Sequence, residues 1–375
     1  MNGGRAMKFL CRTCGKEYDF GELRWKCDCG GYIVLKDKFK FTKKDIKSER
    51  LNMWRYDAAY PLKKDEALIS YNEGLTPLAR LNYENYNIRL KLEYLMPTGS
   101  FKDRGTVMVI NYLNNYNAGF FTEDSSGNAA ASVAGYCALG GLKCALYVPH
   151  GNSSGKILQA KAYGADINEI KGSRSDVAYA AQKFDKAYAG HNWHPLFTEG
   201  TKSIAYELWE QNNFKEPENI IVPCGAGSLV LGLIKGFTEL LESGEIKKLP
   251  KIFAVQPANC NPIYRMFKGI NEDFIPEPTI AEGTSISEPV KAAEISEGIK
   301  LSEGAVLSVK EEEIKEALKF ILKKGYYIEP TSAAAVAGAL QLMEKGILKE
   351  SDEIIIVISG NGLKSGERIQ EILNN

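Results

Sequence analysis

From Ile88 to the end of the chain, short apolar runs alternate with segments of helical periodicity, and this alternation constrains the fold more than any other feature. Three of the runs are almost wholly apolar: ENIIVPC (218–224), KIFAVQP (251–257) and EIIIVIS (353–359). Runs of this kind are typical of strands that are buried on both faces. Strands that alternate with helices predict parallel sheets covered by helices, with ligands bound where strands end and helices begin. The sequence therefore predicts an α/β protein.

Turn and capping residues divide the middle of the chain into further strands and helices. We predict strands at IRLKLEY (88–94), in the first part of AGFFTEDSSGN (118–128), at LKCALYVP (142–149) and at INEIKG (167–172). We predict helices at FKDRGTVMVINYLNNY (101–116), NAAASVAGYCALGG (128–141), SSGKILQAKAYGAD (153–166), SDVAYAAQKFDKAYAG (175–190) and EGTKSIAYELWEQ (199–211). Gly140 and Gly141 are expected to end the second of these helices and Gly164 the third, and Ser175 is expected to cap the fourth.

The composition excludes several classes of function. The chain has 375 residues, enough for two or three domains, with 47 basic and 47 acidic side chains, so no net charge points to nucleic acid. No apolar stretch is long enough to span a membrane, and the start, MNGGRAMKFLCRTC, has no secretory apolar region. We therefore expect a cytoplasmic protein that binds neither nucleic acid nor membrane.

Four of the eight cysteines lie in the first thirty residues. Cys11 and Cys14 form C-x2-C, Cys27 and Cys29 form C-x-C, and Gly15 and Gly30 follow the two pairs. Four thiolates that converge on one ion make a closed, structural zinc site. The alternative is a ribbon that has lost its metal, because the second pair has one spacer residue and not the usual two. The other four cysteines (Cys137, Cys144, Cys224 and Cys260) fall on strand or helix patterns, and we expect them to be small buried hydrophobes.

Two segments connect this cysteine cluster to the α/β region. KDKFKFTKKDIKSER (36–50) is basic and lacks apolar periodicity, so we predict a linker with a solvated surface. MWRYDAAYPL (53–62) carries aromatic residues in no clean period, which fits packing on the large domain or at a subunit contact.

The stretch MPTGSFKDRG (96–105) places Lys102 in the first turn of a predicted helix. The Ser100 side chain is expected to cap this helix, and the Asp103 side chain is expected to accept the backbone N–H of Ser100 in return. This arrangement is an aspartate variant of the capping box. The positive end of the helix dipole disfavours an ammonium group, which makes Lys102 a better nucleophile towards a carbonyl carbon. The alternative is a capped surface helix on which Lys102, Asp103 and Arg104 are simply solvated.

A glycine loop follows the strand at 218–224 and opens a helix. The backbone amides of Gly225, Ala226, Gly227 and Ser228 are expected to surround a phosphate at the positive end of that helix. A dinucleotide fingerprint would need glycine at Val230, and a Walker loop would need a following Lys-Ser/Thr that is absent. A glycine turn for close helix packing is the other interpretation.

Two further polar segments lie at strand ends. SSGN (125–128) stands at a strand-to-helix junction, where Ser125, Ser126 and the free amides can bind a carboxylate, although a polar helix cap explains the same residues. ISGNGLK (358–364) ends the last apolar strand, and an ordinary turn is its alternative. The three histidines, at positions 150, 191 and 194, are too dispersed to indicate a metal set or a catalytic triad.

Together these segments resemble pyridoxal-phosphate enzymes of the tryptophan-synthase-β type, and threonine synthases most closely. NEGLTPL (72–78) is similar to the family's GEGxTPL with Asn72 in place of the first glycine, and EPTSAAAVAG (329–338) is similar to its late helix. The lysine, asparagine, glycine and C-terminal segments arrive in family order, over roughly residues 70 to 365. Several archaeal-type threonine synthases also open with such a ribbon.

The resemblance implies an α/β protein of pyridoxal-phosphate fold type II, with two parallel-sheet domains and a small N-terminal zinc ribbon, assembled as a homodimer. The expected division is 1–36 for the ribbon, 37–102 for a linker and the first part of the large domain, 103–195 for the small domain and 196–375 for the rest of the large domain. By the same resemblance Lys102 holds the cofactor, Asn128 contacts its ring hydroxyl, residues 225–228 bind its phosphate and Ser359 contacts its pyridine nitrogen.

The activity implied is a threonine synthase that converts O-phosphohomoserine and water to threonine and phosphate. Two departures keep alternatives open: Ala129 stands where these synthases tend to carry threonine, and in HPLFTEGTKS, His194 replaces asparagine and Phe197 the phosphate-binding arginine. Arg174 or Lys202 could restore that charge. The alternatives are a serine/threonine dehydratase, a phosphoserine-dependent β-replacement enzyme of the cysteate or cysteine synthase type, and an interaction module on an inactive scaffold.

Overall fold

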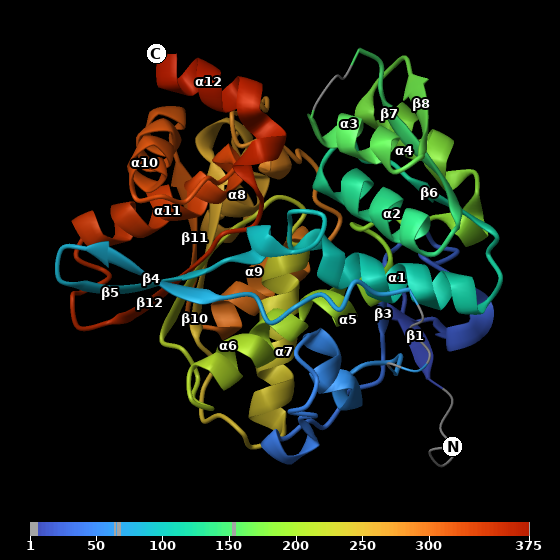
Figure 1. Cartoon of the computed structure of the whole chain (residues 1–375), viewed down its shortest axis with the longest axis horizontal. Coiled ribbons are helices and arrows are strands. Elements are labelled where there is room, and N and C mark those ends of the chain that lie inside the picture. The colour runs from blue at the N-terminus through green and yellow to red at the C-terminus, as the bar shows by residue number, and fades with distance from the viewer. Residues whose placement is uncertain (1–6, 64, 66–68, 152–154, 375) are drawn as a thin grey trace. The chain divides into compact units, whose positions relative to one another are not determined.

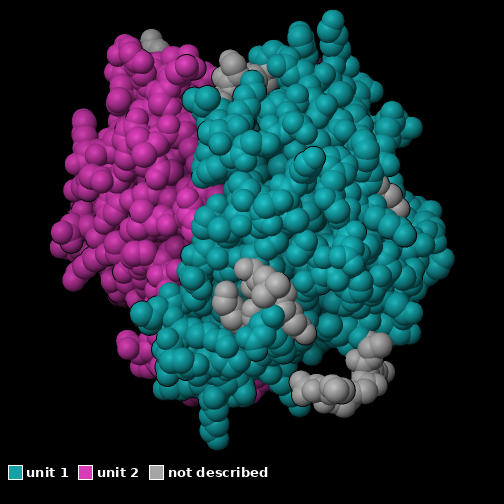
Figure 2. Space-filling view, turned by 45° about the vertical axis from the view of Figure 1, so that its right-hand side comes forward, with its two compact units in different colours: residues 1–73, 102–201 teal, residues 74–101, 202–375 magenta. Residues whose placement is uncertain are grey.

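The computed structural model describes residues 7–63, 65, 69–151 and 155–374 (Figure 1). The chain forms two compact units, and Figure 2 colours them separately. Unit 1 comprises Met1–Glu73 and Lys102–Thr201, and unit 2 comprises Gly74–Phe101 and Lys202–Asn375. Both units are therefore built from discontinuous stretches of chain. The four-part division expected from the sequence stays a prediction.

Unit 2 is built around a six-stranded sheet in the order β11-β10-β9-β12-β5-β4. All neighbouring strands are parallel except β4 and β5, which form an antiparallel pair at one edge. The three apolar runs are confirmed as strands β9, β10 and β12, side by side at the centre of the order. The strand bounds are β4 Leu78–Tyr83, β5 Tyr86–Lys91, β9 Asn219–Pro223, β10 Lys251–Pro257, β11 Ala305–Val309 and β12 Glu353–Val357.

Helices bury both faces of this sheet, which explains why its central strands are continuous apolar runs. Ile221, Phe253 and Ile354 belong to one large core cluster with residues of α10, α11 and α12, whereas their neighbours Ile220 and Ala254, equally buried, point to the opposite face. The helix bounds are α6 Ser203–Gln211, α7 Ser228–Glu242, α8 Pro262–Lys268, α9 Ala292–Leu301, α10 Glu311–Lys323, α11 Pro330–Glu344 and α12 Gly366–Asn374.

Unit 1 contains a three-stranded parallel sheet in the order β6-β7-β8. Its strands are β6 Phe120–Glu123, β7 Lys143–Pro149 and β8 Asp166–Ile170. Its helices are α1 Lys102–Asn115, α2 Asn128–Leu139, α3 Gly155–Ala162, α4 Arg174–Gln182 and α5 Pro195–Thr201. None of the described helices is both long enough and apolar enough to cross a membrane.

The cysteine-rich N-terminal region, residues 7–36, is a small antiparallel sheet in the order β2-β1-β3, with bounds β1 Lys8–Cys11, β2 Glu17–Asp19 and β3 Ile33–Leu35. We call this region the ribbon. It packs on α1, because Phe9 and Phe20 contact the ring of Tyr112 with centroids 6.1 and 4.9 Å away. The aromatic segment after the linker also belongs to unit 1, where buried Trp54 donates its indole N–H to Glu73 (2.9 Å).

The boundaries of two predicted helices are wrong. The helix expected at 199–211 is divided into α5 and α6 at Lys202, which is also where the chain passes from unit 1 to unit 2. Close packing explains the break: a Cβ atom at Gly200 would lie 1.8 Å from the carbonyl oxygen of Arg104, and one at Gly236 would lie 2.6 Å from that of Lys202. Helix α4 is capped by Ser173 and not by Ser175, because Ser173 and Asp176 form a reciprocal capping box, and it ends at Gln182 and not at Gly190. The predicted start of α3 at Ser153 lies outside the described residues.

Candidate active site and metal centre

Lys102 is the first residue of α1, in the helix-start position expected from the sequence. The chain leading to it is held at the end of β12: Phe101 donates its N–H to the carbonyl oxygen of Ser359 (3.1 Å), and Ser100 forms an antiparallel bridge with Gly360. Ser359 is therefore hydrogen-bonded to the residue that immediately precedes Lys102 in the chain.

The predicted cap of this helix by the Ser100 side chain is wrong. The Oγ atom of Ser100 is buried and has no hydrogen-bond partner among the described residues. The carboxylate of Asp103 accepts a hydrogen bond from Ser132 Oγ (2.6 Å) on α2, and both side chains are fully buried. Asp103 thus joins α1 to α2, because a buried carboxylate needs a donor and the nearby helix supplies one.

Phe197 forms an apolar wall beside Lys102. The ammonium of Lys102 lies 5.6 Å from the centre of the Phe197 ring, which is 1% exposed. Close helix packing holds this ring, because a Cβ atom at Gly105 would lie 2.5 Å from it. Position 197 therefore contributes no positive charge beside Lys102.

The segment Asp124–Asn128, which we call the 124–128 loop, joins the end of β6 to the start of α2 as predicted. Ser125 Oγ accepts the N–H of Gly127 (3.0 Å), and Gly127 is the N-cap residue of α2. Ser125, Ser126 and Asn128 are partly exposed, in contrast to the buried residues on either side. Two hydroxyl groups and the free amides of a twelve-residue helix thus lie together at a site suited to a carboxylate.

Asp124 anchors this loop through two partners. Tyr188 donates its hydroxyl to Asp124 Oδ1 (2.7 Å), and Arg174 Nη2 lies 2.6 Å from Asp124 Oδ2. Burial works against the charged guanidinium, but the neighbouring Asp124 carboxylate outweighs it and raises the pKa of Arg174. The Arg174 side chain is still 49% exposed, so a charged group faces solvent beside the loop.

Glu123, the last residue of β6, forms a buried pair with His191 that the sequence did not predict. Its Oε1 lies 3.0 Å from His191 Nδ1, and its Oε2 accepts the backbone N–H of His191 (3.2 Å). Burial, reinforced by the adjacent Asp124 charge, raises the pKa of Glu123 well above its ordinary value. A protonated Glu123 can donate to Nδ1 while its other oxygen accepts the N–H, which fits a neutral pair.

In unit 2 the predicted glycine loop stands between β9 and α7. Gly227 has φ +82° and is the N-cap residue of α7, a backbone conformation that favours glycine. A Cβ atom at Gly225 would lie 2.8 Å from the carbonyl oxygen of Gly283, so no larger residue fits without movement. The loop therefore brings Gly225, Ala226, Gly227 and Ser228 to the N-terminus of a fifteen-residue helix, as a phosphate cradle requires.

Ser359 lies at the end of β12 and is 1% exposed. Its hydroxyl is 3.0 Å from Ser332 Oγ, which also accepts the N–H of Gly360 (3.0 Å). The carboxylate of Glu329 packs against the same glycine, since a Cβ atom at Gly360 would lie 2.2 Å from it. Sequence reasoning missed Ser332 and Glu329, although both lie in the segment EPTSAAAVAG that carried the resemblance.

The NEGLTPL segment crosses from unit 1 to unit 2 and is anchored in each. Asn72, which replaces the family's first glycine, has φ +56°, a left-handed conformation that asparagine tolerates. In unit 1 the Glu73 carboxylate accepts hydrogen bonds from Tyr136 (2.7 Å) and Tyr71 N (3.0 Å). In unit 2 the Thr76 hydroxyl donates to Glu93 (2.6 Å).

Two residues predicted to bind substrate are buried. Lys202 is 0% exposed, and its ammonium lies 3.0 Å from Glu239 Oε2. His194 is 1% exposed, accepts the N–H of Leu196 on Nδ1 (3.3 Å) and contacts the ring of Tyr112. Arg174, with its half-exposed side chain, is the predicted substrate cation that solvent reaches.

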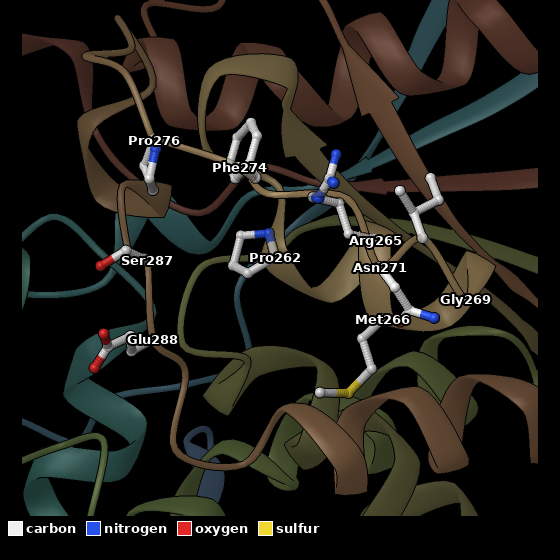
Figure 3. Close-up of a pocket in the computed structure, with 10 residues that line it drawn as sticks. Pro262, Arg265, Met266, Gly269, Asn271, Phe274, Pro276, Ser287 and Glu288 are labelled. Atoms are coloured by element: carbon white, nitrogen blue, oxygen red, sulfur yellow. The ribbon is translucent and has the colours of Figure 1, made fainter.

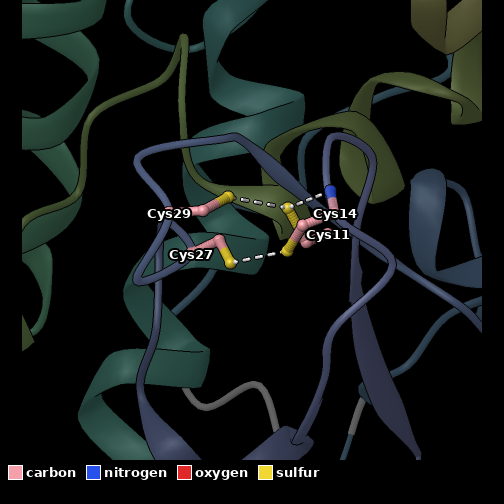
Figure 4. Close-up of side chains that lie close together, drawn as sticks. All are labelled: Cys11, Cys14, Cys27 and Cys29. Atoms are coloured by element: carbon pink, nitrogen blue, oxygen red, sulfur yellow. Dashed lines mark hydrogen bonds between the residues drawn. The ribbon is translucent and has the colours of Figure 1, made fainter.

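The four N-terminal cysteines converge on one point (Figure 4). All four sulfur atoms lie within 4.8 Å of one another, and the Cys11–Cys29 and Cys14–Cys27 pairs are 3.7 and 3.5 Å apart. A tetrahedral zinc site with Zn–S bonds of about 2.3 Å has sulfur–sulfur edges of about 3.8 Å. Burial opposes ionisation of Cys27, but the hydrogen bond from Tyr18 and those from backbone and thiol neighbours lower its pKa to about 6. The cluster therefore fits a metal such as zinc.

The remaining four cysteines are buried, as predicted. Gly15 and Gly30 have φ +74° and +85°, so both cysteine pairs end in the tight glycine turns that the sequence indicated.

A separate hollow of about 500 Å³ lies in unit 2 beside α8 (Figure 3). Arg265 stacks on Phe274 at 4.9 Å and donates to the carbonyl oxygen of Glu272 (2.5 Å). The residues that line the hollow are Pro262, Arg265, Met266, Gly269, Ile270, Asn271, Phe274, Pro276, Ser287 and Glu288. No residue predicted for cofactor, substrate or metal is among them, so the hollow does not enter the candidate site.

A family model described as pyridoxal-phosphate dependent enzyme matches residues 69–360. The chain belongs to the pyridoxal-phosphate dependent enzymes. Within that family it is threonine synthase-like: it is 34% identical to a threonine synthase of Methanocaldococcus jannaschii, over 94% of this chain and 92% of that protein. It is 30% identical to a threonine synthase of Methanosarcina acetivorans, over 96% of this chain and 93% of that protein.

A solved structure supports the fold of this pyridoxal-phosphate enzyme. The L-serine ammonia-lyase of the fungus Rhizomucor miehei is similar with a TM-score of 0.69 at 22% identity, over 80% of this chain and 98% of that one. The predicted fold is confirmed: fold type II, with two parallel-sheet regions and an N-terminal antiparallel sheet that carries the cysteine cluster.

The residues present fit the family's cofactor. The glycine loop offers an anion cradle in which side chains at Gly225 and Gly227 would collide with neighbours. Ser359 offers a buried neutral hydroxyl, and Lys102 offers an amine at a helix start. Each of these groups matches one part of pyridoxal phosphate: its phosphate, its ring nitrogen and its aldehyde.

Proposed function

We propose that this protein is a threonine synthase that converts O-phosphohomoserine and water to threonine and phosphate. The observation that carries the proposal is the placement of Lys102 at the start of α1, directly after a residue hydrogen-bonded to Ser359. The similarity to archaeal threonine synthases over more than nine-tenths of the chain supports the substrate.

Pyridoxal phosphate, when bound, supplies an electron sink for carbanions next to its aldehyde carbon. In the proposal Lys102 holds the cofactor covalently and moves protons at the substrate's α, β and γ carbons. Helix α1 carries this lysine at its positive end, which favours the neutral amine needed for both tasks.

Further residues bind and orient. We assign the cofactor phosphate to the amides of residues 225–228 and the ring hydroxyl to Asn128. Ser359 holds the pyridine nitrogen with a neutral hydroxyl, which keeps that nitrogen largely unprotonated. The substrate carboxylate is assigned to Ser125, Ser126 and the free amides of α2, in keeping with their exposure and helix-start position.

For the substrate phosphate the best candidate is Arg174. Its guanidinium is half exposed and stands beside the 124–128 loop through its pair with Asp124. Lys202 is less suitable because its buried ammonium is paired with Glu239, and His194 is better explained as a buried support of α5. A guanidinium can grip a phosphate through two parallel hydrogen bonds.

A second function, serine/threonine dehydratase, is favoured by one specific observation. Asp124 lies 2.6 Å from Arg174 and offsets its charge, while Phe197 leaves an apolar wall near Lys102. A site with so little free positive charge suits an unphosphorylated substrate. A β-replacement enzyme acting on phosphoserine is the third candidate, and it shares the need for a phosphate-binding cation.

A substrate panel with two measurements separates these functions. The purified protein is given O-phosphohomoserine, phosphoserine, serine and threonine, and both released phosphate and 2-oxo acid are measured. Phosphate release with threonine formation supports the synthase. If 2-oxo acid forms from serine or threonine while O-phosphohomoserine is not turned over, the protein is a dehydratase. Phosphate release from phosphoserine alone indicates β-replacement.

Arg174→Ala tests the phosphate assignment. A charge-assisted contact contributes about 1.5–3 kcal/mol, so kcat/KM for O-phosphohomoserine should fall roughly tenfold or more. The control is Lys171→Ala, which removes an exposed cation three residues before Arg174, in the turn between β8 and α4, and should leave kcat/KM unchanged. An equal effect of both variants would mean that only the overall positive charge near the start of α4 matters.

The proposal includes a structural zinc ion at Cys11, Cys14, Cys27 and Cys29. It also places the enzyme in the cytoplasm as a homodimer acting in threonine biosynthesis.

A further inference from the structure

Trp25 belongs to the ribbon but is buried by residues outside it. Its side chain is 2% exposed, and its ring lies 4.6 Å from that of Tyr188 and 5.5 Å from that of Trp193, both in edge-on contact. With Tyr188 and Ala181 it forms a small core cluster of its own. A sheet of three short strands cannot enclose an indole by itself, so Trp25 joins the ribbon to the α/β part of unit 1.

Tyr188 extends this connection to the 124–128 loop. It is 1% exposed, pairs with Thr122 of β6 through a parallel bridge and donates its hydroxyl to Asp124 Oδ1 (2.7 Å). Burial and the nearby carboxylates of Asp124 and Glu123 raise the pKa of Tyr188 well above its ordinary value, so the hydroxyl stays a donor. Asp124 is the residue before Ser125 and the ion-pair partner of Arg174.

A second attachment joins the ribbon to the helix that carries Lys102. Phe9 and Phe20 pack against Tyr112 of α1, and the Tyr112 hydroxyl donates to the backbone carbonyl of Phe20. The ribbon is thus fixed at two points, one on α1 and one behind the 124–128 loop.

The metal-binding end of the ribbon lies close to Trp25. Cys27 is two residues further along the chain, its N–H donates to the carbonyl oxygen of Gly31 (2.8 Å), and Tyr18 contacts its sulfur (3.1 Å). A bound metal would fix the four cysteine positions and with them the backbone around Trp25. Without it, that backbone depends on the short strands alone.

We propose that Trp25 and Tyr188 are positioning residues through which metal occupancy of the ribbon sets the geometry of the 124–128 loop. The ribbon is then part of the substrate-binding apparatus and not only a docked accessory. The expected effect on substrate affinity rests on the proposed function, in which this loop binds the substrate carboxylate. The expected effect on the geometry of the loop does not depend on that function.

Hydrogen exchange of the full-length, zinc- and cofactor-loaded protein tests the loop. In Tyr188→Phe, the Trp25 contact remains but the bond to Asp124 is lost, and amide exchange in residues 124–128 should become about tenfold faster. The control is Tyr147→Phe, a half-buried tyrosine that packs on the same cluster. Removing zinc with a chelator should produce the same acceleration as Tyr188→Phe.

Binding of L-threonine, the product of the proposed reaction, tests the consequence. Its Kd should rise about tenfold, or about 1.4 kcal/mol, both in Tyr188→Phe and in the zinc-free protein, while Tyr147→Phe keeps the wild-type value. Trp25→Ala should act like zinc removal, and Trp25→Phe, which keeps an aromatic ring, should restore part of the affinity. Cofactor absorbance should be unchanged in all of these proteins.

The two measurements separate the two ideas. If exchange in residues 124–128 is the same in Tyr188→Phe, Tyr147→Phe and the zinc-free protein, the coupling is wrong, whatever the substrate. If exchange responds but L-threonine does not bind the wild type, the coupling stands and the threonine synthase assignment fails. If exchange responds but L-threonine binds all variants equally, the loop geometry does not control affinity, and the claim that the ribbon is part of the substrate-binding apparatus is overturned.

Discussion

The buried ion pair of Lys91 and Glu207 allows a sharp test of what supports the NEGLTPL segment. Both side chains are 0% exposed, and Lys91 Nζ lies 2.7 Å from Glu207 Oε2. Lys91 also donates to the carbonyl oxygen of Thr76 (2.8 Å) and to Gln211 (3.0 Å), while Glu207 accepts the N–H of Leu75 (2.8 Å). The perturbation is Lys91→Met, which keeps an unbranched side chain one atom shorter and removes the charge.

The expected loss of stability follows from what remains behind. Lys91→Met leaves Glu207 buried without its cation, and breaking such a pair costs about 3–5 kcal/mol. For a unit of this size that cost corresponds to a fall in Tm of about 6–20 °C. In the double variant Lys91→Met/Glu207→Gln the remaining group is neutral, and its amide oxygen can still accept the N–H of Leu75. We therefore expect the double variant to recover at least half of the loss.

Calorimetry on the wild type, both single variants and the double variant measures the coupling directly. The control is Lys315→Met, which removes the cation of a partly exposed pair with Glu312 (3.9 Å apart) and should cost less than about 1 kcal/mol. A Tm for Lys91→Met that lies within about 2 °C of the control would refute the reasoning, as would a double variant whose loss equals the sum of the two single losses.

Three other outcomes are expected. Lys102→Ala should prevent borohydride from attaching the cofactor to the protein and should abolish turnover; mass spectrometry of the reduced protein checks this, and cofactor attached elsewhere would contradict the role of Lys102. Gly200→Ala places a methyl group against the backbone of α1 and should lower Tm by several degrees, whereas Gly366→Ala, which meets no atom within 4 Å, should not; thermal scans of both decide. The raised pKa of Glu123 means that its stabilising protonated form is lost as pH rises. Glu123→Gln keeps both hydrogen bonds to His191, so its stability relative to wild type should increase as pH rises above 4.5. A Tm difference that stays constant across pH would exclude titration of Glu123.

The sheets could be predicted because their signal is local. Each residue of β9 is buried, so its apolar run could be identified without knowing its neighbours, and the same holds for β12 apart from its first residue. β4 and β11 were missed, since both lie at sheet edges and mix polar with apolar residues. The break at Lys202 depends on Gly200 and Gly236, whose packing partners are distant in the chain.

In the candidate site, too, local features could be predicted from the sequence and contacts between distant residues could not. Ser125 and Gly227 lie in loops that follow a strand and precede a helix, so their positions could be predicted. Their partners could not be predicted: Asp124 binds Tyr188, which is sixty-four residues away, and Ser359 binds Ser332, which is twenty-seven residues away. Ser100 looked like a helix cap because its type and spacing were right, but the chain before Lys102 pairs with Gly360 and leaves the hydroxyl of Ser100 out of the helix start.

The position of β12 has a consequence for synthesis of the chain. This strand is the last of the sheet along the chain, yet it pairs with β5 on one side and with β9 on the other, in the middle of the unit 2 sheet. Until it leaves the ribosome, β4–β5 and β9–β10–β11 are two separate half-sheets, each with an open apolar edge that can pair wrongly. A nascent chain stalled before residue 353 should therefore be a preferred client of chaperones, because the sheet of unit 2 can close only once β12 has left the ribosome.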